Sequence, residues 1–303
     1  MTFPDITANL ARSMPKLRGT LLAHVPLAPW TWFKTGGLAQ AVFQPEDAED
    51  LGYFLARLDP EIPVLPLGQG SNLLVRDSGV EGVIIALGPS FNTMAIDGEV
   101  VTVGAGVADV KLASTAAMAS LTGFSFLRGI PGSIGGALKM NAGAFGGEIK
   151  DIFLSCEGID RAGALHRFEA AEMGFSYRHS AVKDVIFTKA RFVGKPGDQD
   201  VIRAQMAEIA KSRSATQPVN TKTGGSTFRN PPGRKAWEVI DEAGCRGLVV
   251  GDAQVSELHC NFLVNRGRAT SADLEDLGEE VRRRVLGTCG VMLEWEIERV
   301  GVR

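Results

Sequence analysis

The chain has 303 residues, of which 45% are hydrophobic, and a formal net charge of −3 at pH 7. This length and apolar content allow two or three domains with sizeable cores, and the slightly acidic balance argues against a nucleic-acid-binding protein, which normally has a basic surface. The 36 glycines exceed the usual share of about 7%, but 14 prolines and ordinary apolar content exclude a disordered composition.

The cysteines and histidines show no metal-ligand spacing. There is no C-x-x-C pair among Cys156, Cys245, Cys260 and Cys289, and no H-E-x-x-H among the four histidines. Scattered cysteines are typical of a reducing cytosol. The first residues lack the regions of a signal peptide, and no apolar run approaches the about 20 residues that span a bilayer. We therefore expect a cytoplasmic protein without a metal site and without a membrane or nucleic-acid partner.

Helices and short strands alternate irregularly in the first two thirds of the chain. Residues 1–28 predict a helical arm that leads into a proline-containing segment, and the acidic residues after Pro45 predict a helix that extends to Leu58. A further helix is expected at about 108–121. Short apolar runs predict strands at 62–67, 73–75, 82–85, 100–103, 152–159, 165–168 and 184–192.

Two glycine-rich tracts, residues 67–74 and 129–147, separate these elements, and the second contains seven glycines. Inside a helix or strand each glycine costs roughly 0.5–1 kcal/mol relative to alanine, so we expect neither element there. Successive backbone N–H groups in such loops form anion-binding nests. The two tracts indicate a large anionic cofactor, most simply one with a pyrophosphate. A loop-rich protein with tight turns remains the alternative, because glycine alone does not decide between them.

The C-terminal third follows an expected linker at 194–198. A long helix is predicted at 201–214, and shorter elements follow at 236–243, 248–250 and 262–264. Thr270 and Asp273 form a possible capping box at the start of a helix that extends to residue 286. Leu293, Trp295 and Ile297 alternate with glutamates, which predicts a half-buried last strand.

Familiar nucleotide-binding and hydrolase motifs are missing from the sequence. Gly68 and Gly70 lack the third glycine of the Rossmann fingerprint, because residue 73 is Leu. There is also no P-loop and no G-x-S-x-G nucleophile motif. The glycine tracts therefore need a different explanation.

Five segments in order carry a more specific signal: PLGQGSNLL at 66–74, GIPGSIGG at 129–136, SYRHS at 176–180, GGSTFRNP at 224–231 and LEWEI at 293–297. Together they resemble the UDP-N-acetylenolpyruvoylglucosamine reductases of peptidoglycan synthesis, over about residues 30–301. One such motif is weak evidence, whereas five in order are specific.

The resemblance implies an α+β fold in which a FAD-binding region of the vanillyl-alcohol-oxidase type, made of two α+β subdomains, precedes a C-terminal α/β substrate domain. We expect an N-terminal arm at 1–28, the FAD-binding region at 29–195 with subdomains at about 29–90 and 91–195, and the substrate domain at 196–303, whose last strand returns to the active site. Contacts with FAD are expected at Gly68, Gly70, Ser71, Asn72, Leu73, Gly129, Pro131, Gly132, Ser133, Gly135 and Gly136.

The resemblance also implies an oxidoreductase in which hydride passes from NADPH to FAD and then to the enolpyruvyl ether of UDP-N-acetylglucosamine-enolpyruvate, giving UDP-N-acetylmuramate. Hydride addition leaves negative charge beside a carboxylate, so the reaction needs charge-stabilising groups and a proton donor. By resemblance, Ser226 is the proton donor, Arg178 pairs with the carboxylate and enolate, and Glu296 is the second stabiliser. Asn230 and Tyr177 are expected to contact the UDP-sugar.

Several points stay open at this level. Glu296 lies either on a solvated face with its neighbouring glutamates or on a cleft face. Only twelve residues separate Arg178 from Arg191, so the tyrosine-bearing substrate loop of longer family members is missing and the chain resembles the shorter type. Two other hypotheses are an oxidase of a hydroxy acid or sugar with this fold, and a non-enzymatic module with glycine turns. We expect a monomer that needs no protein partner.

Overall fold

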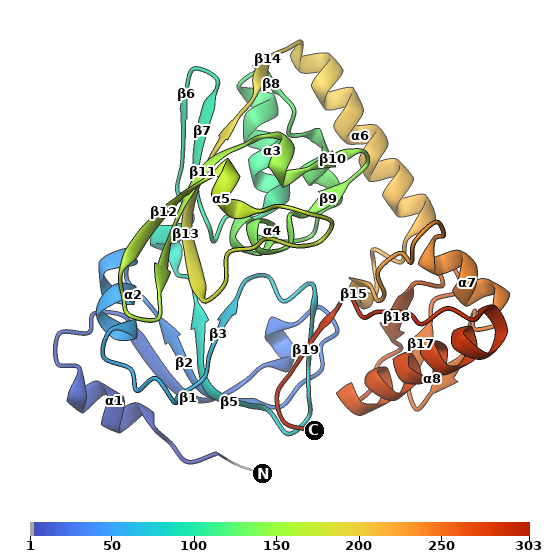
Figure 1. Cartoon of the computed structure of the whole chain (residues 1–303), viewed down its shortest axis with the longest axis horizontal. Helices are drawn as coiled ribbons and strands as arrows, with labels where there is room; N and C mark the ends of the chain where they lie inside the picture. Colours follow the sequence, from blue (N-terminus) through green and yellow to red (C-terminus); the bar gives the residue numbers. More distant parts are fainter. Residues whose placement is uncertain (1–2) are drawn as a thin grey trace.

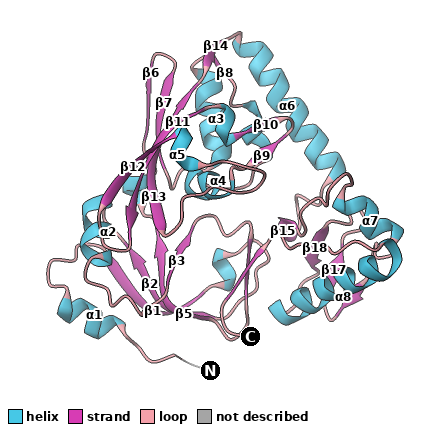
Figure 2. Cartoon of the chain, viewed as in Figure 1, coloured by secondary structure: helices cyan, strands magenta, loops and turns pink. Residues whose placement is uncertain are grey.

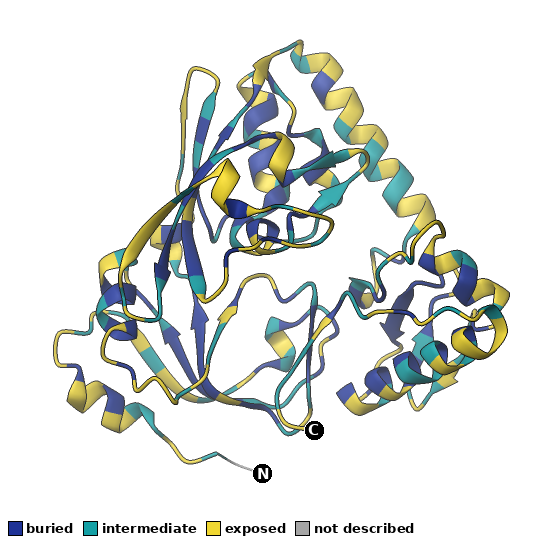
Figure 3. Ribbon diagram, in the orientation of Figure 1, coloured by how far each residue is buried: buried dark blue, intermediate teal, exposed yellow. Residues whose placement is uncertain are grey.

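The computed structural model describes residues 3–303, which form three regions (Figures 1 and 2). Two α+β subdomains lie one above the other, and a C-terminal domain lies beside both of them (Figure 1). Helix α6 (Gln199–Thr216) connects the second subdomain to the C-terminal domain and is largely exposed along its length (Figure 3). Among residues 3–303, no helix combines the length and the apolar character needed to cross a membrane.

The first subdomain contains α1 (Thr7–Ser13), β1 (Thr20–Pro26), η1 (Ala28–Trp30), β2 (Leu38–Gln44), α2 (Ala48–Leu55), β3 (Val64–Leu67), β4 (Leu73–Val75), β5 (Val80–Ala86) and η2 (Pro89–Phe91). Its sheet has the order β1-β2-β5-β3, and only the β1–β2 pair is antiparallel. Buried clusters cover both faces. This explains the nearly continuous apolar runs of its parallel strands. The first glycine loop, residues 68–72, connects β3 to β4.

The second subdomain contains β6 (Met94–Asp97), β7 (Val100–Gly104), α3 (Asp109–Met118), β8 (Leu121–Thr122), η3 (Ser125–Gly129), α4 (Ile134–Met140), β9 (Gly143–Ala144), β10 (Gly147–Glu148), η4 (Ile149–Asp151), β11 (Phe153–Asp160), β12 (Leu165–Glu169), α5 (Ala170–Met173), β13 (Val185–Val193) and β14 (Lys195–Pro196). Its antiparallel sheet has the order β12-β11-β13-β7-β6. The core of this subdomain lies between the sheet and helices α3 and α4. The second glycine loop directly precedes α4 and is therefore supported by this buried core.

The C-terminal domain follows α6 and contains β15 (Lys222–Ser226), α7 (Ala236–Glu242), β16 (Val249–Val250), β17 (Ala253–Val255), β18 (Phe262–Asn265), α8 (Ser271–Cys289) and β19 (Glu298–Val300). An antiparallel sheet of order β15-β18-β17-β16 packs against α7 and α8. The chain then leaves this domain, because β19 pairs in parallel with β4 of the first subdomain. Asp77 reinforces this connection by accepting hydrogen bonds from Ser271 N at 3.0 Å and Ala272 N at 2.9 Å, at the start of α8.

Three sequence predictions about secondary structure are wrong in part. The helical arm is confined to Thr7–Ser13, and Thr20–Pro26 is a strand that belongs to the first sheet; residues 1–2 of the predicted arm lie outside the described residues. The second glycine tract contains helix α4, although it includes two glycines. Residues 293–297 form one isolated bridge, at Trp295, and the last strand begins only at Glu298.

Candidate active site

Arg178 and Glu296 meet between the second subdomain and the C-terminal domain. Arg178 Nε lies 3.0 Å from Glu296 Oε1, and the two side chains are 21% and 11% exposed. Burial raises the pKa of Glu296, and the nearby Arg178 and Arg229 oppose this effect only partly. Glu296 is therefore largely shielded from solvent and does not share the exposed position of Glu294, whose side chain is 75% exposed.

A tight turn presents Arg178. Ser176 and His179 exchange backbone hydrogen bonds of 3.0 and 3.2 Å, and Arg178 inside the turn has φ +54°. Positive φ is uncommon for a long side chain and costs of order 1–3 kcal/mol where the surroundings impose it. Asn141, the left-handed cap of α4, donates from Nδ2 to Ser176 O at 3.1 Å and holds the turn against the second subdomain.

Ser226 lies at the end of β15, directly after an irregularity in the pairing of that strand with β18. A Cβ at Gly224 would collide with Phe33, whereas a Cβ at Gly225, which has φ +82°, would meet open space. Bulges of this kind change the direction of the next side chain and are frequent beside active sites. The backbone conformation of this glycine pair thus explains why Ser226 lies at an open edge of the sheet.

Backbone pairing brings the Ser226 segment beside the Glu296 segment. Glu296 N donates to Thr227 O at 2.8 Å, and Arg229 N donates to Glu294 O at 2.9 Å. Asn72, at the end of the first glycine loop, donates from Nδ2 to Glu296 O at 3.0 Å. The segments that carry Arg178, Ser226 and Glu296 therefore come from three distant parts of the sequence and lie near one another, and the Glu296 segment contacts the first glycine loop.

The two predicted substrate residues lie opposite each other. Asn230 Nδ2 is 3.5 Å from the Tyr177 hydroxyl, and Tyr177 is 47% exposed. Asn230 Oδ1 accepts from Ala236 N at 2.9 Å, so this oxygen is occupied within the protein. The Arg178 guanidinium carbon lies 5.1 Å from the centre of the Tyr177 ring. Both residues thus stand at the entrance to the Arg178–Glu296 pair.

The two glycine loops touch each other. A Cβ at Gly68 would lie 2.5 Å from Ser133 Oγ. The N–H groups of Gly70, Ser71, Gly132 and Ser133 donate no hydrogen bond to an acceptor among residues 3–303. The two adjoining loops thus combine free backbone N–H groups with glycine positions at which a side chain would clash. Such loops are suited to bind the pyrophosphate of a cofactor such as FAD.

Other residues of these loops have different roles in the structure. Leu73 is a buried member of β4, and the Gly135 amide donates to Ala105 O at 2.9 Å. Gly129 ends η3, where a Cβ would lie 2.6 Å from the Phe145 ring. Gly136 lies in the first turn of α4, and Pro131 has no N–H to offer. The free amides are therefore concentrated in the middle of each loop.

Two further residues support the site without having been identified from the sequence. Asn261 accepts from Phe228 N at 3.0 Å and donates to Phe228 O at 2.8 Å, which fixes the chain two residues after Ser226. Asp109 lies under Gly132, and its carboxyl oxygens have no partner among residues 3–303. Burial raises the pKa of Asp109 to about 8. No spacing or pattern signals either residue, because each acts through a contact distant in sequence.

The described part of the chain contains no group of three or more His, Cys, Asp or Glu side chains that could hold a metal ion. The guanidinium groups of Arg178 and Arg229 and the free loop amides are the hydrogen-bond donors of the site, and each guanidinium also lies near a glutamate. This arrangement suits anionic ligands and a reaction that develops negative charge.

Two families match separate parts of the chain. Residues 39–169 match the FAD binding domain family, and residues 217–300 match the family described as UDP-N-acetylenolpyruvoylglucosamine reductase, C-terminal domain. The first match covers the parallel strands of the first sheet, both glycine loops and most of the second subdomain, but not β1. The second covers Ser226, Asn230 and Glu296.

Relatives match along nearly the whole chain. A UDP-N-acetylenolpyruvoylglucosamine reductase of Beijerinckia indica is 65% identical over 299 residues, covering 99% of this chain and 96% of the relative. One from Azorhizobium caulinodans is 58% identical, with 99% and 98% covered. The solved structure of the reductase from Thermus caldophilus is 38% identical, with a TM-score of 0.82, and covers 94% of this chain and 99% of that one. These likenesses confirm the predicted α+β fold, with its FAD-binding region and additional C-terminal domain.

Proposed function

The chain belongs to the UDP-N-acetylenolpyruvoylglucosamine reductase family of FAD-dependent oxidoreductases, and we propose that it uses NADPH to convert UDP-N-acetylglucosamine-enolpyruvate to UDP-N-acetylmuramate. FAD, when bound, would supply the redox chemistry, which is hydride transfer between NADPH and the terminal methylene carbon of the enolpyruvyl group. Gly70, Ser71, Gly132 and Ser133 hold the FAD pyrophosphate through their free backbone N–H groups.

The costly event is the accumulation of negative charge on the substrate. When hydride reaches the methylene carbon, the α-carbon and its carboxylate together become an enolate with one additional negative charge. Arg178 pairs with this group, because a guanidinium can donate two parallel hydrogen bonds to two oxygens. Preorganised donors of this kind typically contribute about 3–4 kcal/mol each to transition-state stabilisation.

Ser226 delivers the proton that completes the reaction. Its hydroxyl donates a proton to the α-carbon of the enolate, so one hydride and one proton have been added across the double bond, and the Ser226 alkoxide that remains takes a proton from water before the next turnover. Glu296 in its neutral form donates a hydrogen bond to an enolate oxygen, and the burial that raises the pKa of Glu296 favours this form. A positioned general acid typically contributes about 10²–10⁴-fold.

One observation carries this assignment: the Arg178–Glu296 pair lies beside the Ser226 segment and is bonded through Asn72 to a loop with free amides. An alcohol oxidase would need a base that removes a proton from its substrate. A guanidinium 3.0 Å from Glu296 suits the stabilisation of an anion on the substrate and not the removal of a proton from an alcohol. Asn230 and Tyr177 at the entrance are suited to contact the nucleotide-sugar part of the substrate.

The visible spectrum of the purified protein tests the proposal. Under anaerobic conditions we expect a yellow flavin spectrum that NADPH bleaches and that UDP-N-acetylglucosamine-enolpyruvate restores in a one-to-one ratio. A parallel titration with NADH measures the preference for the phosphorylated cofactor. A flavin that NADPH reduces but the enolpyruvyl nucleotide does not reoxidise would contradict the proposed substrate.

We also propose that the protein acts as a monomer in the cytoplasm. All residues assigned above come from one chain, so the site needs no contribution from a second copy. The four cysteines are free, as a reducing compartment would keep them. Light scattering at the concentration of the activity assay tests the first point, and a dimer whose dissociation abolishes turnover would contradict it.

A further inference from the structure

Trp295, the residue before Glu296, is fastened to helix α8. Its indole Nε1 donates to Glu279 Oε1 at 2.8 Å. The ring packs so closely on the helix that a Cβ at Gly278 would collide with it. On its other side, the ring lies 5.1 Å from that of Phe228. A polar bond and close packing thus fix this side chain, although it is only partly buried.

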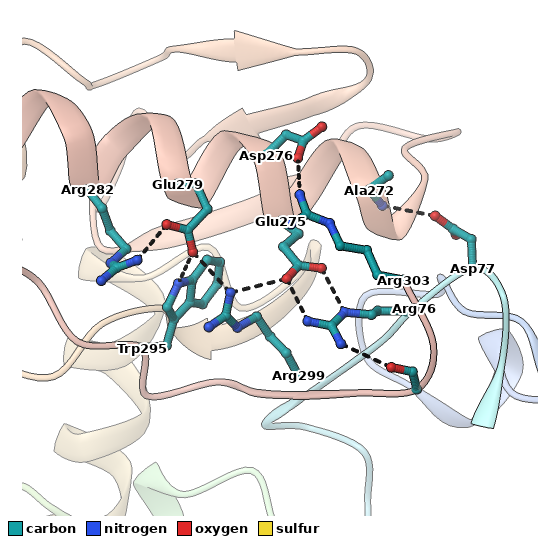
Figure 4. A network of polar contacts seen from close by, with 11 residues as sticks. Arg76, Asp77, Ala272, Glu275, Asp276, Glu279, Arg282, Trp295, Arg299 and Arg303 are labelled. Atoms are coloured by element: carbon teal, nitrogen blue, oxygen red, sulfur yellow. Dashed lines mark hydrogen bonds and ion pairs between the residues drawn. The ribbon is translucent and has the colours of Figure 1, made fainter. Parts of the chain in front are cut away.

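Arg299, three residues after Glu296, joins the same attachment (Figure 4). Its guanidinium carbon lies 4.5 Å from the centre of the Trp295 ring. Its Nη1 lies 3.0 Å from Glu279 Oε1 and 3.1 Å from Glu275 Oε1. The segment that carries Glu296 is therefore held to α8 on both sides of the catalytic carboxyl.

Arg76 connects this attachment to the first subdomain. It follows β4 directly and donates to Glu275 from Nε at 3.0 Å and from Nη2 at 2.9 Å. Glu275 is only 3% exposed, so its charge depends on these partners. Figure 4 shows the resulting chain of contacts from Arg76 through Glu275 and Arg299 to Glu279 and Trp295.

These side chains attach to α8 a segment whose backbone is held by single hydrogen bonds, such as those from Glu296 N to Thr227 O and from Asn72 Nδ2 to Glu296 O, and not by a ladder. Among residues 3–303 this segment has no strand ladder and only the isolated bridge between Phe228 and Trp295. We propose, on the basis of the function assigned above, that Glu279 is a positioning residue, which holds Glu296 opposite Arg178 through Trp295 and Arg299.

The neighbouring residue Glu280 provides a matched control on the same helix. It pairs with Arg283 and Arg284 at 2.7 Å each and has no bond to Trp295 or Arg299. Removal of either glutamate changes the charge of α8 by the same amount. Only the loss of Glu279 should release the segment that carries Glu296.

The test compares Glu279→Leu, Glu279→Gln and Glu280→Leu in the FAD-loaded protein. Misplacement of a catalytic group by about 1 Å can cost 10²-fold, so we expect Glu279→Leu to slow reoxidation by the enolpyruvyl nucleotide about 10²-fold. Its FAD content and its reduction by NADPH should stay within about twofold of the wild type. Glu279→Gln should recover most of the loss, because its amide oxygen still accepts from the indole N–H, and Glu280→Leu should behave like the wild type.

A second readout follows Trp295 without turnover. The chain has four tryptophans, so 5-fluorotryptophan labelling gives a ¹⁹F spectrum in which Trp295→Phe identifies the Trp295 signal. That signal should shift or broaden in Glu279→Leu and stay near its wild-type position in Glu279→Gln and Glu280→Leu.

The inference is overturned if Glu279→Leu is reoxidised at the wild-type rate, or if both half-reactions and the FAD content fall together, as in general unfolding. Failure of the wild-type protein itself to be reoxidised would instead contradict the proposed function, and the ¹⁹F shift would still report whether Glu279 positions Trp295.

Discussion

Glu296 lies 3.0 Å from Arg178 Nε, and only 11% of its side chain is exposed. Its alternation with Glu294 and Glu298 is compatible with a solvated strand face, and only the fold shows that it is enclosed beside Arg178. The motif match predicted which residue types take part in the chemistry. It could not predict the positive φ of Arg178, because long side chains rarely adopt that conformation and nothing in the local sequence demands it.

The raised pKa of Glu296 leads to a prediction about pH. Below that pKa the neutral carboxyl donates to the enolate, whereas above it the carboxylate repels the developing charge. We predict that the rate of reoxidation by substrate falls as pH rises through the raised pKa, above the ordinary Glu value of about 4.3. Glu296→Gln keeps a donor that does not titrate, so the variant should lose this decline.

Stopped-flow reoxidation at a series of pH values, with NADPH reduction completed beforehand, measures the effect. A decline of the same size and midpoint in Glu296→Gln would show that another group is responsible. Wild-type reduction by NADPH over the same pH range is the control, because Glu296 should not influence that step in this way.

Among the secondary-structure elements, local signals were predictable and distant contacts were not. The capping box of α8 was predicted because its two partners are three residues apart, and Asp273 N donates to Thr270 Oγ1 at 3.0 Å. The alternation at 293–297 correctly indicated that Leu293 and Ile297 are buried, at 0% and 2% exposure. The alternation could not indicate that Trp295 packs on Gly278 instead of lying in a paired β-strand.

Thr270→Ala should destabilise the protein by about 1 kcal/mol, because the first turn of α8 loses a side-chain acceptor for Asp273 N. Urea unfolding followed by far-ultraviolet circular dichroism measures the change in free energy of unfolding. Thr270→Ser retains the acceptor and should recover most of it. Equal destabilisation by Ala and Ser would mean that the hydroxyl does not act as the cap.

The glycine tracts show how packing can override helix propensity. Gly135 and Gly136 lie in α4, where a Cβ at Gly135 would be 3.3 Å from Ala105. A close approach to a neighbouring segment thus explains Gly135, which a local reading assigned to a loop, whereas a Cβ at Gly136 would come no closer than 3.8 Å to its nearest neighbour. The first loop needs glycine for a related reason, since Gly68 packs against Ser133 of the second.

Gly68→Ala should therefore separate the two loops and reduce FAD content. The added Cβ would lie 2.5 Å from Ser133 Oγ but 3.7 Å from Ser133 Cβ. Adding Ser133→Ala removes the clashing oxygen, so the double variant should retain more FAD than Gly68→Ala alone. The ratio of flavin to protein absorbance after purification measures this, and equal FAD loss in both variants would contradict a direct contact between the loops.

At the scale of the whole molecule, the C-terminal domain is joined to the first subdomain by contacts that no sequence pattern reveals. Arg76 and Glu275 are 199 residues apart, and Asp77 caps a helix that begins 194 residues later. β19 adds a strand to β4 in the same region. The order of the motifs predicted that the chain returns to the active site, but the ion pairs that secure this return depend on the assembled fold (Figure 4).

The Arg76–Glu275 contact should make stability depend on pH in a defined direction. The hydrogen bond from Arg76 lowers the pKa of Glu275 in the folded chain. Its stabilising contribution is therefore complete above the ordinary Glu pKa of about 4.3 and is lost as pH falls through the lower folded value. Breaking a buried pair typically costs about 3 kcal/mol, so Glu275→Gln should be destabilised by about this amount near neutral pH.

Urea midpoints of the wild type and Glu275→Gln at decreasing pH test this directly. The difference between the two proteins should be largest near neutral pH and should shrink in acid, once Glu275 is protonated in the wild type. A difference that stays constant over the whole range would contradict the role assigned to the charge of Glu275.

The most direct test of the assigned chemistry separates the two half-reactions in Ser226→Ala. NADPH should reduce the bound flavin of this variant at a rate within about twofold of the wild type. Reoxidation by UDP-N-acetylglucosamine-enolpyruvate should be slower by about 10²–10⁴-fold, because no side chain delivers the proton. Ser214→Ala, on the exposed helix α6, serves as the control. Reoxidation of Ser226→Ala at the wild-type rate would contradict the account.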